Sequence, residues 1–585
     1  MANADSLKAE TAGTRIPPAS RGVGSALLSR LFGPREAIWL GPLLAPYRLP
    51  VAALFALTLV AAGTALIPPY LTKLVIDQGL MAGNKQALVL FSVLLFAIGL
   101  AAVGIGVVNS LLHMRFSAHL LADLRRAAVA RILVQSPRWQ ARQKLGELMS
   151  RLDGDASEVQ QFAFAALVNG GGSLVKLLGG VAMLFVLEPT LALIALALAP
   201  VELVFFAKAR PVTHTRAREV RTARGALASR LAETISGLSA LRALNATDVA
   251  AAAVEDRQKG LIKALMSAQV WNEVTRAVPM ALTAILRGAI FLIGGFAVID
   301  GQLPLGSLIA FTAYLAFLIG PMQSLIGLWH GQARMKAALL RLDEVMSAAP
   351  DVAEPATPAA LPADGRGALV LSRLADGPSE RLLFTDLTAH IPAGAKVRIE
   401  GPSGIGKSTL LGLIQRHHDP RAGAILLDGI DLRQLAVGDL RRAVALVPQK
   451  GHVFSGMVAE NLRLGHPGAT DAEMTDMLTL VELHERFGAD GLATLLGEGG
   501  LDLSGGERQR LCLARALMQP FRVLILDESL SEVDGDRVAR IMAAIDDRFR
   551  DRTRLVVTHG GASHYGRFDT AIDLAAFASR LGPTA

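Results

Sequence analysis

The chain has 585 residues, of which 52% are apolar and 19% charged, and it carries a net charge of +8. This length allows two to four domains, and the composition excludes a disordered chain and argues against an ordinary soluble protein. From Arg366 onward there are 26 basic and 28 acidic residues, so the basic surplus lies in the apolar N-terminal part. This distribution is typical of a membrane protein and disfavours nucleic-acid binding.

The only cysteine, Cys512, excludes an intramolecular disulfide and a cysteine-based metal site. We expect it to be a small core residue. The first 44 residues are basic and contain no apolar run of the signal-peptide type, which predicts a cytosolic N-terminus. Residues 1–43 form either a disordered tail or a tail with a short interfacial helix, in which Leu27, Leu28, Leu31 and Phe32 share one face.

Six stretches approach or exceed the roughly 20 apolar residues that a helix needs to cross a bilayer. They run approximately over Leu49–Leu71, Ala87–Leu112, Gln161–Val186, Leu191–Ala207, Ala277–Ile299 and Pro304–Leu328. Two long polar segments of helical periodicity separate some of them, from Met114 to about Gln160 and from Lys208 to Arg276. We interpret these segments as extensions of the spans beyond the membrane.

The orientation follows from the lysines and arginines of the connections. The first long segment holds eight of them and the second twelve, whereas the connections on the other side hold almost none. Basic residues concentrate in cytoplasmic loops, so both long segments and both chain termini are predicted to be cytoplasmic.

The C-terminal part changes character. An Ala- and Pro-rich linker follows the spans, and after it short β-branched or Leu-rich runs alternate with helical stretches. We therefore predict a multidomain protein with an all-α six-helix transmembrane domain, which has long cytoplasmic helical extensions, followed by an α/β P-loop ATPase domain. The predicted boundaries are 44–345 for the transmembrane domain, 346–366 for the linker and 367–585 for the ATPase domain.

A phosphate-binding loop follows the strand-like run Lys396–Glu400 and precedes a helical run. It fits G-x-x-x-x-G-K-[ST] and consists of Gly401, Pro402, Ser403, Gly404, Ile405, Gly406, Lys407, Ser408 and, at the helix start, Thr409. Backbone amides and the helix N-terminus attract a phosphate chain, Lys407 neutralises its β- and γ-phosphates, and the Ser408 hydroxyl is a Mg²⁺ ligand. This pattern predicts ATP and Mg²⁺ as the bound groups.

Two further strand-like runs end in residues suited to phosphate chemistry. Val523–Asp527 is an apolar run followed by Glu528; Asp527 is the candidate for the Mg²⁺ shell and Glu528 for polarising the attacking water. A second run ends at His559, which is a candidate contact to the γ-phosphate, although a histidine in such a place is more often structural.

The segment Leu503-Ser504-Gly505-Gly506-Glu507-Arg508-Gln509-Arg510 is the most specific in the chain. A Ser-Gly-Gly sequence that opens a helix is a second anion cradle. With the P-loop and the carboxylates, it makes the chain resemble an ATP-binding-cassette exporter half-transporter from about Leu43 onward. The resemblance implies that Ser504, Gly505 and Gly506 of one subunit close on the ATP held by the other subunit, and hence a homodimer or a heterodimer with a second half-transporter.

Other residues match the same family pattern. Gln449 resembles the glutamine that touches Mg²⁺ and links to the membrane domain, so it joins Lys407, Glu528 and His559 as a candidate catalytic residue. Thr494–Gly500, with Glu498, resembles the exporter segment that contacts the cytoplasmic loops. Gly146–Leu152 resembles the coupling region of the first loop.

The chain departs from the pattern at two places. The region Leu371–Gly377 lacks the aromatic residue on which adenine usually stacks; either Arg373 stacks in its place or affinity rests mainly on the phosphates. After the catalytic carboxylate the usual Ser-Ala-Leu-Asp is Ser531-Glu532-Val533-Asp534. Glu532 adds a charge at the expected dimer seam, and we predict that it slows or retunes hydrolysis.

Charged residues within the spans are costly and are candidates for a substrate cavity. Lys176 lies in the third span, Glu202 in the fourth and Arg287 in the fifth. They form either a cationic cavity for an anionic or zwitterionic substrate or a buried structural ion pair. Glycines of the third span are expected to allow close helix packing.

These observations together predict an ATPase that drives membrane transport. It would export or flip an amphipathic lipid, peptide or conjugate by alternating access, and an anionic substrate is one candidate. The alternatives are an ATP-gated channel or membrane sensor and an importer of the same architecture. We expect contact with membrane lipid, no nucleic acid and a bacterial inner membrane location.

Overall fold

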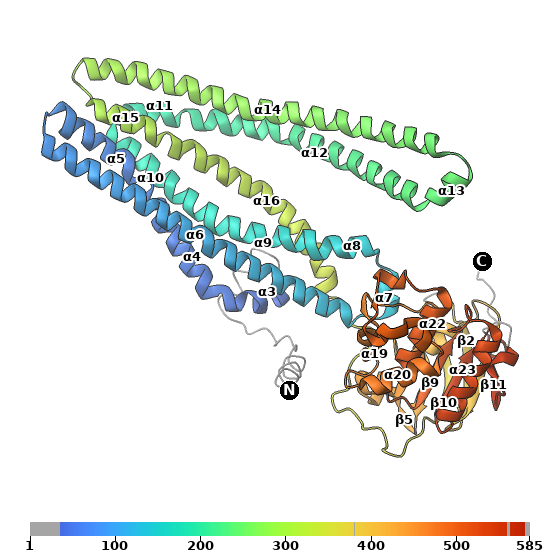
Figure 1. Cartoon of the computed structure of the whole chain (residues 1–585). Coiled ribbons are helices and arrows are strands. Elements are labelled where there is room, and N and C mark those ends of the chain that lie inside the picture. Colours follow the sequence, from blue (N-terminus) through green and yellow to red (C-terminus); the bar gives the residue numbers. More distant parts are fainter. Residues whose placement is uncertain (1–35, 379–380, 559–561, 579–585) are drawn as a thin grey trace. The chain divides into compact units, whose positions relative to one another are not determined.

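The computed structural model describes residues 36–378, 381–558 and 562–578. The chain forms two compact units (Figure 1). One consists of Met1–Arg131 and Gly146–Ser347, as far as these are described, and the other of Ile132–Leu145 and Ala348–Ala585. The tail at 1–35, and with it the expected interfacial helix, lies outside the described residues.

The membrane unit confirms the six predicted spans. In the described part of the chain, six helical stretches are long and apolar enough to cross a bilayer: Ile38–Met81, Lys85–Leu133, Leu145–Leu187, Pro189–Ser236, Thr247–Ile299 and Leu305–Met346. Each is more than 40 residues long. The helices therefore extend well beyond the apolar runs, as the periodicity of the polar segments predicts.

Several spans consist of consecutive helices. The helices of this unit are α3 (Glu36–Leu44), α4 (Arg48–Thr64), α5 (Ile67–Leu74), α6 (Lys85–Leu133), α8 (Leu145–Ser150), α9 (Ala156–Phe164), α10 (Gly171–Leu187), α11 (Pro189–Leu196), α12 (Leu198–Ser236), α13 (Leu238–Ala243), α14 (Thr247–Ile299), α15 (Leu305–Tyr314) and α16 (Ala316–Met346). Wider π-type turns at η2 (Val75–Met81), η3 (Arg151–Asp155) and η4 (Ala165–Gly170) continue the helical path between some of them.

The glycines of α10 pack closely against neighbouring helices. A Cβ atom at Gly180 would lie 2.7 Å from Cβ of Phe317 on α16, and one at Gly172 would lie 3.1 Å from Cγ2 of Thr58 on α4. Real Cβ atoms essentially never approach as closely as at Gly180, so this position needs glycine, whereas a Cβ at Gly172 would require the Thr58 methyl group to shift slightly. The expected close packing of this span is confirmed.

The helices α12 and α14 form a long antiparallel pair joined through α13 (Figure 1). A hydrogen bond of 2.9 Å from Nε1 of Trp271 to Oγ1 of Thr213 links them midway. Both helices contain a proline, Pro211 and Pro279, and continue through it.

The ATPase domain is built on a parallel sheet in the order β11-β3-β10-β9-β6, beside an antiparallel sheet in the order β2-β1-β4-β5. A third, two-stranded sheet pairs β7 with β8. The strands are β1 (Leu369–Asp376), β2 (Phe384–Ile391), β3 (Lys396–Glu400), β4 (Ala422–Leu427), β5 (Ile430–Asp431), β6 (Val444–Val447), β7 (Gly456–Met457), β8 (Leu495–Leu496), β9 (Val523–Asp527), β10 (Thr553–Val557) and β11 (Thr570–Asp573).

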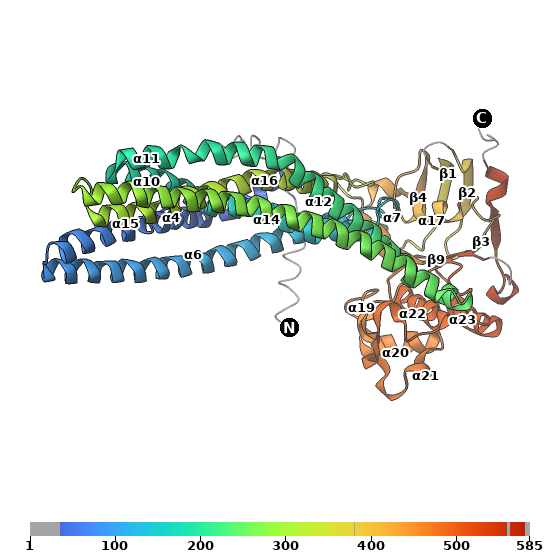
Figure 2. The same cartoon turned by 90° about the horizontal axis from the view of Figure 1, so that it is seen from above.

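Two apolar cores hold these layers together. One lies between the sheets and the helix after the P-loop, and the other packs the five helices from Val458 onward against β6 and β9. The helices are α17 (Lys407–Ile414), α18 (Val437–Ala443), α19 (Val458–Arg463), α20 (Asp471–Leu480), α21 (His484–Phe487), α22 (Gly505–Leu517) and α23 (Gly535–Arg548). Figure 2 shows α19, α20 and α21 gathered in a lobe apart from β1, β2 and β4. Cys512 is buried in the second core, as expected.

The linker runs along the surface of the ATPase domain. It contains an isolated bridge between Ala359 and Leu435, and the carbonyl of Ala353 accepts a hydrogen bond of 3.1 Å from Arg416. The linker is therefore attached to this domain by backbone contacts.

Candidate active site and substrate cavity

The carboxyl ends of four parallel strands bring the predicted ATP-site residues to one edge of the sheet. β3 pairs with β10, β10 with β9, and β9 with β6, all in parallel. The P-loop follows β3, Asp527 ends β9, and Gln449 comes two residues after β6. Because parallel strands end at the same edge, residues far apart in sequence meet there.

The P-loop has the backbone conformation that its glycines permit. Gly401, Gly404 and Gly406 have φ angles of 138°, 81° and 115°, which other residues rarely adopt. A Cβ at Gly406 would also lie only 3.2 Å from Cβ of Leu383. The loop leads directly into α17, whose N-terminal amides and dipole attract a phosphate group.

Lys407 is the first residue of α17 and lies inside the loop. Its Nζ donates to the carbonyl oxygen of Gly401 at 2.7 Å and to that of Pro402 at 3.4 Å. Only 8% of the residue is exposed. The loop's own carbonyls therefore hold the ammonium group at the phosphate cradle, and a side chain that is already ordered loses less entropy when it binds a phosphate.

Glu528 and Gln449 are brought into direct contact. Nε2 of Gln449 donates to Oε2 of Glu528 at 2.7 Å, and the backbone amide of Glu528 donates to the carbonyl of Val557 at 3.1 Å. Glu528 has a φ of 50°, unusual for a residue with a side chain and typical of strained functional positions. The fold therefore brings the side-chain amide of Gln449 into contact with the carboxylate of Glu528, the candidate for polarising water, although the two residues are 79 positions apart.

The cradle at Ser504 begins α22 with a reciprocal cap. The backbone amide of Ser504 donates to Oε2 of Glu507 at 2.8 Å, and the amide of Glu507 donates to Oγ of Ser504 at 3.3 Å. Partial burial favours a higher pKa for Glu507, but these contacts and Arg486 hold the pKa below its ordinary value. The cap fixes the start of the helix, so the N-terminal amides at Gly505 and Gly506 are positioned for an anion.

Glu532 lies against this helix start. A Cβ added at Gly505 would overlap the Glu532 carboxylate, and one at Gly506 would lie 2.7 Å from the Glu532 carbonyl oxygen. The backbone amide of Glu532 donates to Oε1 of Gln509 at 3.0 Å, which holds the segment in place. A carboxylate of the same chain therefore occupies the positive end of α22, where a phosphate is expected.

In the region where an aromatic residue usually stacks on adenine, β1 ends in a buried carboxylate. The side chain of Asp376 is 2% exposed; its Oδ2 lies 2.7 Å from Nε2 of His418 and accepts from Arg138 at 3.0 Å. The Asp376 carbonyl accepts from the amide of Leu383, which lies beside the P-loop glycine Gly406. Burial favours a higher pKa for Asp376, but the hydrogen bonds from His418 and Arg138 hold the pKa below its ordinary value.

Arg138 belongs to α7 (Pro137–Ala141), a short helix from the first polar segment that packs with the ATPase domain. Ser136 caps this helix and hydrogen-bonds to Asp351 of the linker. The segment Gly146–Leu152, expected to resemble the coupling region, begins where the chain returns to the membrane unit. Sequence reasoning missed the cluster of Arg138, Asp376 and His418, because no local pattern links residues 238 and 42 positions apart.

His559 lies outside the described residues, so its expected position is not part of the described site. Glu498 lies in a short turn after β8 (Leu495–Leu496). Arg373 has a φ of 43°, and its backbone amide donates to Oγ1 of Thr388 at 3.1 Å.

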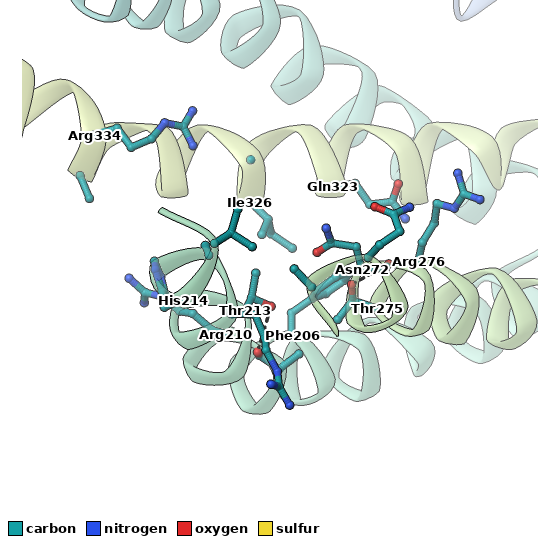
Figure 3. A pocket seen from close by; sticks show the side chains of 18 of the residues that line it. Phe206, Arg210, Thr213, His214, Asn272, Thr275, Arg276, Gln323, Ile326 and Arg334 are labelled. Atoms are coloured by element: carbon teal, nitrogen blue, oxygen red, sulfur yellow. Dashed lines mark hydrogen bonds between the residues drawn. The ribbon is translucent and has the colours of Figure 1, made fainter. Parts of the chain in front are cut away.

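The membrane unit contains a large cavity between α12, α14 and α16, with a volume of about 1250 Å³ (Figure 3). Apolar side chains form much of its wall, and labelled polar side chains from all three helices surround it in Figure 3. In the described part of the chain the lining includes five arginines and no acidic residue; the arginines are Arg210, Arg216, Arg221, Arg276 and Arg334.

The five arginines differ in their partners. Three are paired with exposed or partly exposed glutamates outside the lining: Arg216 with Glu219, Arg276 with Glu273 and Arg334 with Glu158. The guanidinium of Arg210 lies over the Trp329 ring, 4.7 Å from its centroid, and Arg221 donates to a carbonyl of its own helix. Neither forms an ion pair with the other described residues. Surface ion pairs contribute little and exchange easily, so the arginines give the cavity lining a positive potential.

The three charged residues predicted to form a cavity do not line this one. Lys176 on α10 is half-buried, Arg287 on α14 is exposed, and Glu202 on α12 is 1% exposed. No ion pair joins Glu202 to either cation among the described residues, and both of its carboxylate oxygens lack a hydrogen-bond partner there. Four of the lining arginines belong to the second polar segment, and Arg334 follows the sixth apolar stretch; nothing in the sequence indicated that they would lie around one cavity.

Comparison with known proteins agrees with the architecture. The family described as ABC transporter transmembrane region matches residues 51–322, and the family described as ABC transporter matches residues 384–531. Proteins of Staphylococcus aureus strains RF122 and NCTC 8325 that carry the name multidrug export ATP-binding/permease protein are 28% identical over 532 residues, which cover 88% of this chain and 91% of theirs.

A solved structure of a bacterial Atm1-family ABC exporter with ATP bound has a TM-score of 0.76 and 22% identity, and the match covers 90% of this chain and 94% of that chain. This likeness shows the fold. With the two family matches and the six spans, it establishes the class of the protein: the chain is an exporter-type half-transporter of the ATP-binding-cassette family, an integral membrane protein that binds ATP and couples its hydrolysis to transport.

Proposed function

We propose that this protein is a homodimeric exporter or flippase for amphipathic substrates that carry anionic groups, and that it works by alternating access. The observation that carries the proposal is the arginine-lined cavity between α12, α14 and α16, in a chain that also holds the P-loop, the Ser504–Gly506 cradle and the candidate catalytic Glu528. The apolar wall suits an acyl or aromatic portion, and the arginines suit phosphate or carboxylate groups.

At the ATP site, Lys407 binds the β- and γ-phosphates and stabilises the charge that develops on the transferred group. Glu528 accepts a proton from the attacking water, and its contact with Gln449 orients the carboxylate toward the phosphate edge of the sheet. His559 assists at the γ-phosphate.

The donors near the P-loop fit a Mg²⁺ ion. Ser408 follows Lys407 at the start of α17, and Asp527 is the last residue of β9. Together with the amide oxygen of Gln449, they supply the hard oxygen ligands that Mg²⁺ prefers. When bound there, Mg²⁺ would neutralise phosphate charge. The protein's own part is to hold these oxygens at one sheet edge.

Each complete site needs two subunits, because Ser504–Gly506 would close on the ATP bound to the partner's P-loop. One chain carries both the P-loop half and the Ser-Gly-Gly half, so a homodimer is sufficient. A heterodimer with a second half-transporter stays an alternative.

The ion pair of Arg138 with Asp376 supports coupling between the two activities. The helix α7 belongs to the polar segment between the second and third spans. The Asp376 carbonyl accepts a hydrogen bond from Leu383, which lies beside the P-loop glycine Gly406. Closure of the ATPase dimer would therefore move α7 and, through its flanking helices, the spans. The orientation with both termini cytoplasmic, in a bacterial inner membrane, is part of this proposal.

The test measures ATPase activity of the purified chain in lipid nanodiscs and vectorial flux in proteoliposomes. We compare the wild type with Glu528→Gln, Arg210→Ala and, as a control, Arg257→Ala, an exposed arginine of α14 outside the cavity. Anionic amphiphiles should stimulate the wild type, and Arg210→Ala should raise the half-stimulating concentration about tenfold, whereas the control should not.

Stimulation without directional flux would instead indicate an ATP-gated channel or sensor, and flux into the cytoplasmic side would indicate an importer. ATP binding without turnover in the wild type would point to a missing partner chain.

A further inference from the structure

Glu202 is a buried carboxylate whose charge has no partner in the described part of the chain. The residue is 1% exposed, and neither Oε1 nor Oε2 has a hydrogen-bond partner there. It lies within the fourth apolar stretch, Pro189–Ser236. An unpartnered acid in a membrane helix is costly, so such a residue is a candidate for binding a ligand.

Glu202 faces the same side of α12 as the residues that line the cavity. Phe206 and Ala209, four and seven residues further along the helix, both line it, and Ala209 is buried like Glu202. Residues separated by four and seven positions lie on one helix face, and four residues span about 6 Å along the axis. Glu202 therefore lies about one turn beyond the cavity end that Phe206 marks.

The charges along this face of α12 are ordered. The carboxylate of Glu202 comes first, and the cavity arginines of this helix, Arg210, Arg216 and Arg221, follow toward its polar end. Arg210 and Glu202 are eight residues apart, about 12 Å along the helix axis. A substrate that spans this distance meets a carboxylate at one end and guanidinium groups at the other.

We propose that Glu202 binds a cationic group of the substrate, a primary ammonium, while the arginines of the cavity bind its anionic group. The substrate class is then a zwitterionic amphiphile and not a simple anion. This inference rests on the proposed function, because it assigns one more contact in the same cavity.

The arrangement also explains why the carboxylate is not paired with any residue that the structure describes. An internal lysine or arginine would neutralise Glu202 permanently, and a substrate ammonium would then have to displace it. A ligand that carries an ammonium group gains an ion pair with the unpartnered carboxylate and binds more tightly. A ligand without an ammonium group leaves the carboxylate unpaired.

The test uses two matched probes, dodecylphosphoethanolamine and its N-acetyl derivative, which share the chain and the phosphate but differ in the ammonium. Stimulation of ATPase activity is measured in nanodiscs for the wild type, Glu202→Gln, Glu202→Asp and the control Glu233→Gln, an exposed glutamate of α12 outside the cavity. The wild type and the control should respond to the ammonium probe at a concentration about tenfold lower than to the acetylated probe.

Glu202→Gln should lose this preference and keep its response to the acetylated probe, which also shows that the variant is folded. Glu202→Asp, which retains the charge, should keep part of the preference. Equal responses of the wild type to both probes, or an equal weakening of both by Glu202→Gln, would overturn the assignment of Glu202 and leave the arginine-lined cavity as an anion-binding site. A wild type that responds to neither probe would overturn the proposed phosphate-bearing cargo and this inference with it.

Discussion

The ATPase domain and the membrane unit hold their functional residues in different ways. In the ATPase domain, short motifs end neighbouring parallel strands, so the sheet order alone brings Lys407, Asp527 and Gln449 to one edge. In the membrane unit, the cavity depends on which faces of three helices meet, and each helix contributes residues spread over several turns. The comparison teaches that local sequence specifies a site best when backbone topology, and not side-chain packing, assembles it.

The sharpest test of the ATP site separates ATP binding from ATP hydrolysis. Lys407→Ala removes the ammonium that the loop carbonyls hold, so both ATP binding and hydrolysis should fall, the latter by about 100-fold or more. Glu528→Gln removes only the candidate base, so hydrolysis should fall by about 100-fold or more while ATP binding is retained. Nucleotide binding and ATPase rate, measured on the same preparations, check this difference. Equal loss of binding in both variants would contradict the role given to Glu528.

The dependence of the membrane unit on close side-chain packing is tested at Gly180. Its missing Cβ allows α16 to approach, with Phe317 Cβ only 2.7 Å from where a Cβ would lie. Gly180→Val should lower the free energy of unfolding by about 1–3 kcal/mol. Thermal unfolding in detergent measures the effect, with Gly104→Val as the control because a Cβ at Gly104 meets no atom within 4 Å. A Gly180 variant as stable as the control would show that the helices relax freely there.

The ion pair between Arg138 of α7 and Asp376 tests the proposed coupling between ATP hydrolysis and transport. Arg138→Ala removes the ion pair with Asp376 but leaves His418 on the carboxylate. Because the arginine is partly exposed, we expect about a fivefold loss of substrate-stimulated ATPase activity, with the unstimulated rate retained. Arg142→Ala, an exposed neighbour, serves as the control. A parallel fall of both rates in Arg138→Ala would indicate a general loss of folding instead of coupling.

Glu532 tests whether a departure from the family motif has a function. Its carboxylate lies at the start of α22 and would repel a phosphate there. Glu532→Ala should raise the ATPase rate about two- to fivefold, the range expected for one charge at a helix N-terminus. The rate constant and the KM for ATP are measured beside Glu485→Ala, an exposed acid of α21. An unchanged rate in Glu532→Ala would remove this residue from the control of hydrolysis.

The smallest expected effect concerns His417, next to the cluster at Asp376. Burial, with the nearby Arg441, lowers the pKa of His417 from 6.5 to about 4. The unfolded chain therefore binds a proton below pH 6.5 that the folded chain does not, so stability falls as the pH falls from 6.5 toward 4. At pH 5.5 the loss attributable to His417 should be about 1 kcal/mol relative to pH 7.5.

This pH effect is measured as the temperature of half-inactivation after incubation at each pH, with activity assayed at pH 7.5. His417→Gln should narrow the difference between pH 5.5 and 7.5, whereas the exposed His484→Gln should not. An identical pH dependence in wild type and His417→Gln would show that other groups govern acid stability.

The amino-acid sequence by itself determined the six spans, the P-loop, the Ser504–Gly506 cradle and the family. Each depends on local hydropathy or on a short motif with a fixed backbone conformation, as the positive φ angles of Gly401 and Gly406 illustrate. It also predicted that the glycines of α10 serve close packing, because a helix with glycine on one face has few other uses.

Only the tertiary structure decided which charged residues meet. Lys176, Glu202 and Arg287 were expected to form either a cationic cavity or a buried ion pair. The cavity between α12, α14 and α16 is lined by other cations, all arginines, and Glu202 lies about one turn beyond it with no hydrogen-bond partner among the described residues. The Asp376 cluster likewise joins α7, β1 and the segment after α17. The physical reason is that a side-chain cluster depends on the rotation and separation of whole helices and strands, which the packing of many apolar residues sets together, whereas a motif carries its own geometry in a few consecutive residues.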